Sequence, residues 1–406
     1  MKIAGIIAEY NPFHTGHAYH IAQTSAALGP ESAVVAVMSG NWVQGAECAI
    51  ADKWTRARLA LLGGADLVLE LPTLWAVSSA ETFARGGVEI LDACGVVNVL
   101  SFGSESGELE PLAQAAACLD TPAYRLELNA LLPSGLSFPR CRQLAAQNLL
   151  GEEAAAVLAS PNNNLGIEYL RAISRLGSAM APMTVRREGA AHNSLSQDRP
   201  AHLSATQVRA CLRQGDRDTP APYLVPGALD LLTEPLPRLE ENPTAQRLVL
   251  ARLRTMSELD WAALPDSGAG EGLPSRLVLA GRRAASLDEF YDIAKTKRYT
   301  HARLRRLALW AYLGLSAQDR PAHVPYLRVL AFNTRGQEVL ARMRKTAQLP
   351  ILVKPARARR LSPQAQRLFG LEARCTDLYD LLRPDLAPGG REWRTSPCFQ
   401  KEVPQP

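Results

Sequence analysis

The amino-acid sequence lacks the features that would place it in a membrane or outside the cell. No apolar run reaches the length of a membrane span, and the short apolar run from Ile3 to Ala8 is followed at once by Glu9, unlike a secretory leader. The seven cysteines are scattered and contain no CxxC pair, which argues against a disulfide framework and a zinc ribbon. These absences predict a globular protein of the reducing cytoplasm, without a membrane partner.

Neither sign of charge dominates the chain, because 45 basic and 40 acidic residues leave a net charge of only +5. A whole-chain charge this small does not define a partner, so the distribution of the charge matters more. Between Arg335 and Arg367 only Glu338 opposes a run of lysines and arginines. A second basic cluster precedes this run and comprises Lys295, Lys297, Arg298, Arg303, Arg305 and Arg306. The positive charge is therefore concentrated in the C-terminal part.

Short apolar runs alternate with helical patterns through the first part of the chain. Strands are expected at 2–9, 33–39, 65–71, 97–102 and 183–187, and helices at 16–28, 52–62, 80–93 and from about 165. Strands separated by helices at this spacing predict parallel βαβ units in a doubly wound, Rossmann-like α/β sheet. Such sheets bind ligands beyond the carboxyl ends of their strands.

The pattern changes near Pro220, and a chain of 406 residues usually holds more than one core. Amphipathic helical segments are expected at 244–256, 287–294 and 300–313, followed by strands at 327–332 and 350–353 and a helix at 336–346. We therefore predict two domains, residues 1–220 and residues 221–406. The second is expected to be mainly helical and basic, with a small α/β element.

The turn after the first strand, His14-Thr15-Gly16-His17, predicts adenylyl chemistry. A helix N-terminus accepts phosphate through its free N–H groups and its dipole, and Gly16 lets the backbone approach the ligand. His14 and His17 share one helix face, so both can donate to phosphate oxygens as charge builds up during attack at the α-phosphorus. We predict these two histidines to be catalytic.

Two other interpretations of the histidines fit the sequence less well. His14, His17 and His20 recur at every third residue and could bind zinc, but i+3 steps on a helix rotate each by about 60° out of line. No cysteine or carboxylate stands at a familiar ligand spacing. They could also be ordinary surface histidines, although Asn11, Pro12 and the preceding strand favour a functional turn.

The wider pattern resembles a known family. The His-Thr-Gly-His turn is similar to that of the HxGH nucleotidylyltransferase superfamily, and Ser204-Ala205-Thr206-Gln207-Val208-Arg209 is similar to its second motif. Five further segments, which together cover most of the chain, resemble the bacterial tRNA(Met) cytidine acetate ligases: Glu9 to Phe13, Val37 to Asn41, Phe102 to Glu105, Pro161 to Gly166 and Lys295 to Thr300.

The resemblance implies that acetate is activated with ATP to acetyl-adenylate, and that the acetyl group then passes to N4 of the wobble cytidine of elongator tRNA(Met). It implies a nucleotidylyltransferase-like ATP-binding catalytic domain over residues 1–220. ATP is then the substrate, and Mg²⁺ is expected with the triphosphate, without ligands that the sequence can name. The implied ATP contacts are Ile7, Ala8, Glu9, Tyr10, Asn11, Pro12, Phe13, His14, Thr15, Gly16, His17, Ala18, Tyr19, His20, Gly103, Asn162 and Arg187.

Each of the last three contacts has a chemical rationale and a plainer alternative. Gly103 would let a bare backbone pack on adenosine, or it is a turn glycine. The amide of Asn162 could read a nucleotide, or it caps the following helix. Arg187 could hold phosphate bidentately, or it is a solvated surface residue.

The second motif and the second helix supply further candidates. Ser204, Thr206 and Arg209 could bind the β- and γ-phosphates at a helix N-terminus, or they form an ordinary N-cap with a surface arginine. Lys53 and Arg56 are additional candidates for phosphate or tRNA contact.

One segment departs from the family pattern. Relatives usually carry Arg-Gly-Glu-Pro after the Ser-Gly-Asn turn, whereas this chain has Gly45-Ala46-Glu47-Cys48, so only Glu47 matches. The missing arginine requires compensation if it normally holds phosphate or tRNA.

The basic C-terminal part predicts a nucleic-acid partner, although a solvated basic face is the plainer alternative. Tyr299 and Trp310 are expected to stack on unpaired bases. The residues predicted to bind tRNA are Lys295, Lys297, Arg298, Arg357, Arg359 and Arg360.

Two competing functions fit parts of the sequence. An adenylyltransferase for a small metabolite or coenzyme precursor would explain the first domain but leave the basic second domain without a role. A non-catalytic tRNA-binding protein would not need both histidines and the second motif. No base for the acetyl transfer, and no acetate pocket, is identified from the sequence.

Overall fold

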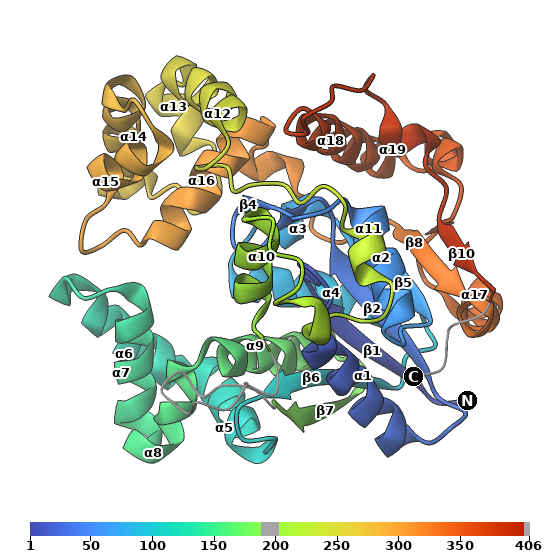
Figure 1. The fold of residues 1–406 in the computed structure, drawn as a ribbon. Helices are drawn as coiled ribbons and strands as arrows, with labels where there is room; N and C mark the ends of the chain where they lie inside the picture. The colour runs from blue at the N-terminus through green and yellow to red at the C-terminus, as the bar shows by residue number, and fades with distance from the viewer. Residues whose placement is uncertain (188–202, 402–406) are drawn as a thin grey trace.

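The computed structural model in Figure 1 describes residues 1–187 and 203–401. Eight strands form one sheet in the order β10-β8-β5-β2-β1-β6-β7, with β9 paired to β8, and β3 and β4 form a separate hairpin. The strands are β1 (Ile3–Ala8), β2 (Ala33–Ser39), β3 (Trp42–Val43), β4 (Glu47–Cys48), β5 (Leu67–Leu71), β6 (Val99–Ser104), β7 (Ala181–Arg186), β8 (Leu327–Asn333), β9 (Ile351–Leu352) and β10 (Cys398–Gln400).

Five neighbouring strands, β5, β2, β1, β6 and β7, run parallel, and β1 lies in the middle of them. The chain leaves β1 towards β2 and β5 and then crosses to the other side of β1 to form β6. The strand order thus reverses beside β1, and ligands bind at this point in open α/β sheets. The doubly wound α/β fold predicted from the sequence is confirmed.

Helices cover both faces of this parallel block. Because side chains alternate along a strand, Val35 and Val37 of β2 belong to one core, and Ala36 and Met38 belong to the other. The first core is covered by α3 (Thr73–Ala76), α4 (Ala80–Ala93), α9 (Pro161–Leu176) and α17 (Thr334–Thr346). The second is covered by α1 (Thr15–Leu28), α2 (Lys53–Leu62), α10 (Ala205–Arg213) and α11 (Ala228–Leu231).

The remaining helices form three groups (Figure 1). An insertion between β6 and α9 holds α5 (Glu110–Leu119), α6 (Pro122–Leu131), α7 (Phe138–Leu150) and α8 (Glu152–Ala155). A helical bundle holds α12 (Pro243–Thr255), α13 (Glu258–Ala262), α14 (Leu273–Arg283), α15 (Leu287–Ala294) and α16 (His301–Leu313). The last two helices are α18 (Pro363–Asp380) and α19 (Arg391–Arg394).

The C-terminal strands extend the main sheet instead of building an element of their own. β8 pairs antiparallel with β5, and β10 pairs parallel with β8. Both sides of the predicted boundary after residue 220 therefore contribute to one sheet, and the division into two domains stays a prediction. The loop expected between β7 and α10 lies largely outside the described residues.

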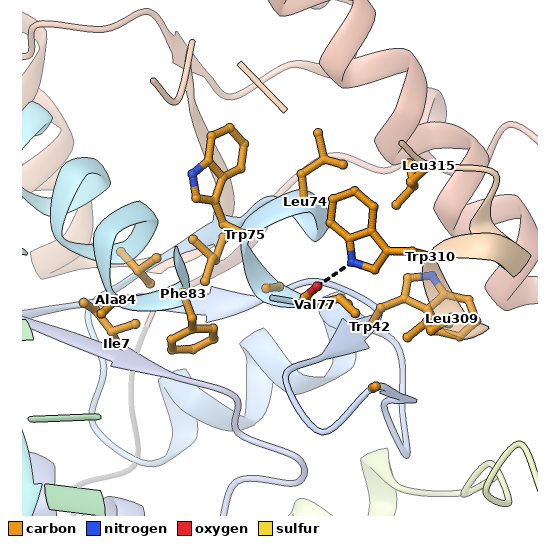
Figure 2. Close-up of a cluster of buried hydrophobic side chains, with 14 of the residues drawn as sticks. Ile7, Trp42, Leu74, Trp75, Val77, Phe83, Ala84, Leu309, Trp310 and Leu315 are labelled. Atoms are coloured by element: carbon orange, nitrogen blue, oxygen red, sulfur yellow. Dashed lines mark hydrogen bonds between the residues drawn. The ribbon is translucent and has the colours of Figure 1, made fainter. Parts of the chain in front are cut away.

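The bundle docks on the sheet through buried aromatic side chains. Figure 2 shows Trp310 of α16 donating a hydrogen bond from Nε1 to the carbonyl oxygen of Val77, at 2.5 Å. Trp310 is 1% exposed, and Tyr299 is 5% exposed with its hydroxyl bonded to the carbonyl of Glu271. The prediction that Tyr299 and Trp310 stack on bases is therefore wrong, because both rings are already used in packing.

A buried network of charges joins α18 and α19 to the sheet. Lys53 Nζ lies 2.6 Å from both Glu70 Oε1 and Glu392 Oε2, and the guanidinium of Arg328 also contacts Glu392. Glu372 instead bonds Thr73, whose N–H and hydroxyl meet its two carboxyl oxygens at 2.8 and 2.7 Å. Lys53 is therefore a structural cation, and its predicted contact with phosphate or tRNA is wrong.

Arg56 is also fully buried, at the carboxyl end of the strands. Its guanidinium donates to the carbonyl oxygens of Glu9 (2.6 Å), Ala51 (3.0 Å), Ser39 (3.0 Å) and Gly40. An arginine whose donors are used by backbone carbonyls cannot hold a ligand. The predicted contact of Arg56 with phosphate or tRNA is wrong, and the residue instead ties the ends of β1 and β2 together.

The charge network predicts how stability depends on pH. In this network the three buried carboxyls of Glu70, Glu372 and Glu392 lie near only two cations, Lys53 and Arg328. Burial, together with the charge of Glu70, raises the pKa of Glu372 to about 8. An acid with a raised folded-state pKa contributes stability at low pH that is lost as the pH rises from its unfolded value through the folded one. Glu372→Gln should therefore make Tm fall less than that of the wild type between about pH 5 and 8.5. If the profiles of Tm against pH ran parallel in the wild type and in Glu372→Gln, the raised pKa of Glu372 would be contradicted.

Candidate active site

The turn between β1 and α1 is held from several sides. Tyr10 adopts a left-handed backbone conformation (φ 47°), and the Asn11–Pro12 peptide bond is cis. The ring of Phe13 lies against Gly63 at the end of α2, where an added Cβ would come within 2.0 Å of the ring. Asn11 Oδ1 accepts the N–H of Ile50 at 2.8 Å. Packing on both sides therefore fixes where α1 begins.

His14 and His17 cap the N-terminus of α1 reciprocally. Gly16 N–H donates to His14 Nδ1 at 3.0 Å, and His14 N–H donates to His17 Nδ1 at 3.2 Å. A neutral imidazole that accepts at Nδ1 carries its proton on Nε2. Each ring therefore has an Nε2–H donor, and the ring centroids lie 3.9 Å apart. Two such donors at a helix N-terminus suit a phosphate.

The electrostatics keep His17 neutral. Burial lowers the pKa of His17 well below its usual value, and the neighbouring His14, Arg187 and His20 lower it further. A neutral ring still donates from Nε2, so its role does not depend on a positive charge. Over the physiological range His17 should act as a hydrogen-bond donor and not as an acid.

His20 is engaged elsewhere, on β6. Its Nε2 lies 2.9 Å from Ser101 Oγ, which lies 2.7 Å from Thr24 Oγ1, and the Thr24 hydroxyl donates to the carbonyl of His20. Burial and the charge of Arg187 lower the pKa of His20 to about 4. The described residues contain no group of three His, Cys, Asp or Glu side chains that could hold a metal ion. His14, His17 and His20 therefore do not converge on one point, as a zinc site would require.

Gly103 and Arg187 lie together at the ends of β6 and β7. A Cβ added to Gly103 would sit 3.1 Å from Arg187 Cγ, so the arginine side chain passes over the glycine. The exposed Arg187 is also close enough to His17 and His20 to shift their pKa values. The strand ends therefore bring a cation beside the two imidazoles, which suits a phosphate ligand.

Asn162 lies in the first turn of α9, whose N-cap is Ser160. Its Nδ2 donates to Glu105 Oε1 at 2.9 Å, and the Ser160 hydroxyl donates to the same oxygen at 2.7 Å. The alternative that Asn162 itself caps the helix is wrong. Glu105, which follows β6, was not predicted as a site residue, although its position after a strand end offered a signal.

The second motif opens α10 and touches the first. Ser204 caps the helix in a reciprocal pair with Gln207. Arg209 Nη1 donates to the carbonyl of Asn11 at 2.7 Å, and Nη2 lies 3.3 Å from Thr206 Oγ1. The structure thus brings Arg209 to the histidine turn, while phosphate binding by Ser204, Thr206 and Arg209 stays a prediction.

The departure from the family pattern lies on the β3–β4 hairpin beside this contact. Ala46, which stands at the glycine of the expected Arg-Gly-Glu-Pro pattern, adopts a left-handed conformation with φ 58°. Glu47 pairs with Arg209 at 3.2 Å and approaches Arg213 at 3.7 Å. The glutamate that the chain keeps is therefore the one that positions the second motif. Sequence reasoning did not predict Arg213 as a partner of Glu47, because the two residues lie far apart in the sequence and no local pattern connects them.

The residues predicted to bind tRNA lie in two separate parts of the fold. Lys295, Lys297 and Arg298 are exposed in the loop between α15 and α16. Of the three, only Arg298 lines a surface pocket of about 350 Å³, together with Arg276 and Glu271. Three other arginines are exposed on a 3-10 helix (Pro355–Arg360) before α18: Arg357, Arg359 and Arg360. Within the described chain these six form no ion pair, whereas Arg303, Arg305 and Arg306 each pair with a carboxylate.

The fold and this site define a class of protein. A family model described as HIGH Nucleotidyl Transferase matches residues 1–392, so the chain is a member of that class. None of the helices in the described residues is both long and apolar enough to cross a bilayer.

Individual relatives narrow the class. The tRNA(Met) cytidine acetate ligase of Alkaliphilus metalliredigens is 35% identical over 99% of this chain and 100% of its own length, and that of Syntrophomonas wolfei is 36% identical over 98% and 99%. Crystal structures of Thermotoga maritima TmcAL, apo and bound with alpha-thio ATP, match with TM-scores of 0.92 and 0.90 at 31% identity, covering 99% of this chain and 100% of theirs. The chain belongs to the tRNA(Met) cytidine acetate ligase family.

The capping pair predicts the effect of removing His17. His17→Ala should slow adenylyl chemistry about 100- to 1000-fold, because a donor to the transition state is lost. It should also cost about 1 kcal/mol of stability, because the His14 N–H loses its acceptor. Exchange of labelled pyrophosphate into ATP and thermal unfolding measure the two effects. His301→Ala, at the first position of α16, is the matched control and should leave the exchange unchanged; an undiminished rate in His17→Ala would contradict the role.

The left-handed residue on the hairpin gives a second prediction. Ala46→Gly should raise the free energy of unfolding by about 1 kcal/mol, because glycine removes the steric cost of a positive φ. Ala285→Gly, in an exposed loop without a positive φ, should instead lower it slightly. Urea unfolding measures the free energy of unfolding of both variants. A lower value for Ala46→Gly than for the wild type would contradict backbone strain at Ala46.

Proposed function

We propose that this protein is an ATP-dependent ligase that acetylates N4 of the wobble cytidine in elongator tRNA(Met), giving N4-acetylcytidine. The observation that carries the proposal is the pair of Nε2–H donors of His14 and His17 at the switch point of the sheet. The relatives that match this chain over nearly its full length are tRNA(Met) cytidine acetate ligases. Its place of action is then the cytoplasm.

In the first step an acetate oxygen attacks the α-phosphorus of ATP. A P–O bond to acetate forms, the bond to the β-phosphate oxygen breaks, and pyrophosphate leaves with the electron pair. His14 and His17 donate to the oxygens that gain charge, with Arg187 supplying a positive charge beside them. Mg²⁺, when bound with ATP, would supply charge neutralisation on the triphosphate.

The ATP contacts follow the strand ends. The segment from Ile7 to His20 surrounds the α-phosphate, and the adenosine packs beside Gly103, over which the Arg187 side chain passes. Asn162, held by Glu105, reads polar groups of the nucleoside. Ser204, Thr206 and Arg209 bind the β- and γ-phosphates at the N-terminus of α10, which the Arg209–Asn11 contact keeps beside α1.

In the second step the N4 amine of cytidine attacks the acetyl carbonyl carbon, and AMP leaves. The tRNA is held by the two exposed basic clusters, in the α15–α16 loop and before α18. Under this proposal residues 1–220 supply the ATP site, and residues 221–406 supply most of the tRNA contacts.

The test uses the purified protein with ATP, labelled acetate and total bacterial tRNA, followed by nucleoside analysis. We expect labelled N4-acetylcytidine in tRNA(Met), and exchange of pyrophosphate into ATP that requires acetate. Exchange that ignores acetate, without label in tRNA, would instead identify an adenylyltransferase for a small metabolite. Binding of tRNA without any exchange would identify a non-catalytic binding protein.

The tRNA contacts predict a salt-dependent change in affinity. Replacing Lys295, Lys297 and Arg298 by alanine should weaken tRNA binding and reduce the slope of log K against log salt by about 2, because each contact releases counterions. Filter binding at several salt concentrations measures both. The control replaces three exposed residues: Lys2, which precedes β1, and Arg344 and Lys345, in the last turn of α17. An equal loss of tRNA affinity in both triple variants would contradict a direct contact of this cluster with tRNA, because the loss would then reflect only the net charge of the protein.

A further inference from the structure

Glu9 is the first residue after the central strand and stands beside the histidine turn, partly exposed. Both its backbone and its side chain are held. Its carbonyl accepts from Arg56 at 2.6 Å, and its Oε1 accepts the N–H of Gln44 at 2.6 Å. The carboxylate is therefore held at the carboxyl end of β1, the edge at which open α/β sheets bind their ligands.

The other carboxylates near this edge of the described structure are already committed. Glu47 is paired with Arg209 and Arg213, and Glu70 is buried against Lys53. Glu105 binds the side chains of Ser160 and Asn162. Glu9, unlike Glu47 and Glu70, takes part in no ion pair within the described residues.

The surroundings of Glu9 come from four elements. Arg209 of α10 and Arg56 of α2 attract its negative form, and Glu47 of β4 repels it. The hydroxyl of Tyr169 on α9 is close enough for the charge of Glu9 to affect it. Burial outweighs the attractive contacts and raises the pKa of Glu9 above its usual value. A carboxylate with a raised pKa is a stronger proton acceptor near neutral pH.

We propose that Glu9 is the general base of the acetyl transfer, so that it accepts the proton that the cytidine N4 amine loses. The C–N bond forms between N4 and the acetyl carbon, the C–O bond to the α-phosphate breaks, and AMP departs with the electron pair. The proton from N4 moves to a Glu9 carboxyl oxygen. This assignment rests on the proposed function, and it concerns only the second step.

The test separates the two steps in the full-length protein. Glu9→Gln keeps an oxygen to accept the Gln44 N–H but cannot take the proton. Because Glu9 lies in the segment proposed to contact ATP, acetate-dependent pyrophosphate exchange should also fall, but about tenfold less than the transfer. Single-turnover acetyl transfer from chemically prepared acetyl-adenylate to tRNA should fall about 100-fold or more. Glu9→Asp should recover part of the transfer rate.

The pH profile provides the second readout. Wild-type transfer should rise as the pH increases through the pKa of Glu9, because the base acts when deprotonated, and this limb should be absent in Glu9→Gln. Transfer by Glu9→Gln at the wild-type rate, or an equal loss in both steps, would overturn the assignment. Absence of acetate-dependent exchange in the wild type would instead overturn the proposed function itself, and the role of Glu9 with it.

Discussion

The site depends on a buried arginine at the carboxyl end of the central strands. The charged guanidinium of Arg56 is fully buried, and it donates hydrogen bonds to the carbonyl oxygens of Glu9, Ser39, Gly40 and Ala51. Burying a charge is costly unless it is fully hydrogen-bonded, so these carbonyls are held where the guanidinium needs them. The exit of β1, and therefore the histidine turn, is fixed by this requirement.

From that fixed exit the same atoms serve structure and chemistry. The backbone N–H groups at the start of α1 need acceptors, and the Nδ1 atoms of His14 and His17 supply them. Capping in turn decides the tautomer and leaves each proton on Nε2. The second motif joins through Arg209, which contacts the carbonyl of Asn11 and the carboxylate of Glu47.

The sequence predicted the local elements of the fold well, because they depend on local periodicity. The strand expected at 33–39 and the helices expected at 80–93 and 287–294 have those bounds in the structure. It could not predict that β8 and β10 complete the main sheet, because pairing between β5 and β8 joins residues far apart in the chain. A helical pattern likewise does not say what a helix packs against.

The same limit explains the errors at single residues. Lys53 and Arg56 were interpreted as ligand contacts from their charge, and their burial became visible only with Glu392 and the strand-end carbonyls in place. Tyr299 and Trp310 were interpreted as base-stacking from their residue type, whereas the docking of α16 on Val77 buries the indole. The strand-turn-helix context around His14 and His17 is itself local, so the sequence predicted it, while the catalytic role of the two histidines stays a prediction.

The central claim is that the capped histidine pair is where the α-phosphate of ATP binds. A crystal structure of this protein with an α-thio analogue of ATP tests it most directly. The account predicts oxygens of the α-phosphate within hydrogen-bonding distance of Nε2 of both His14 and His17, with the adenosine against Gly103. An analogue bound with its phosphates away from both imidazoles would contradict it.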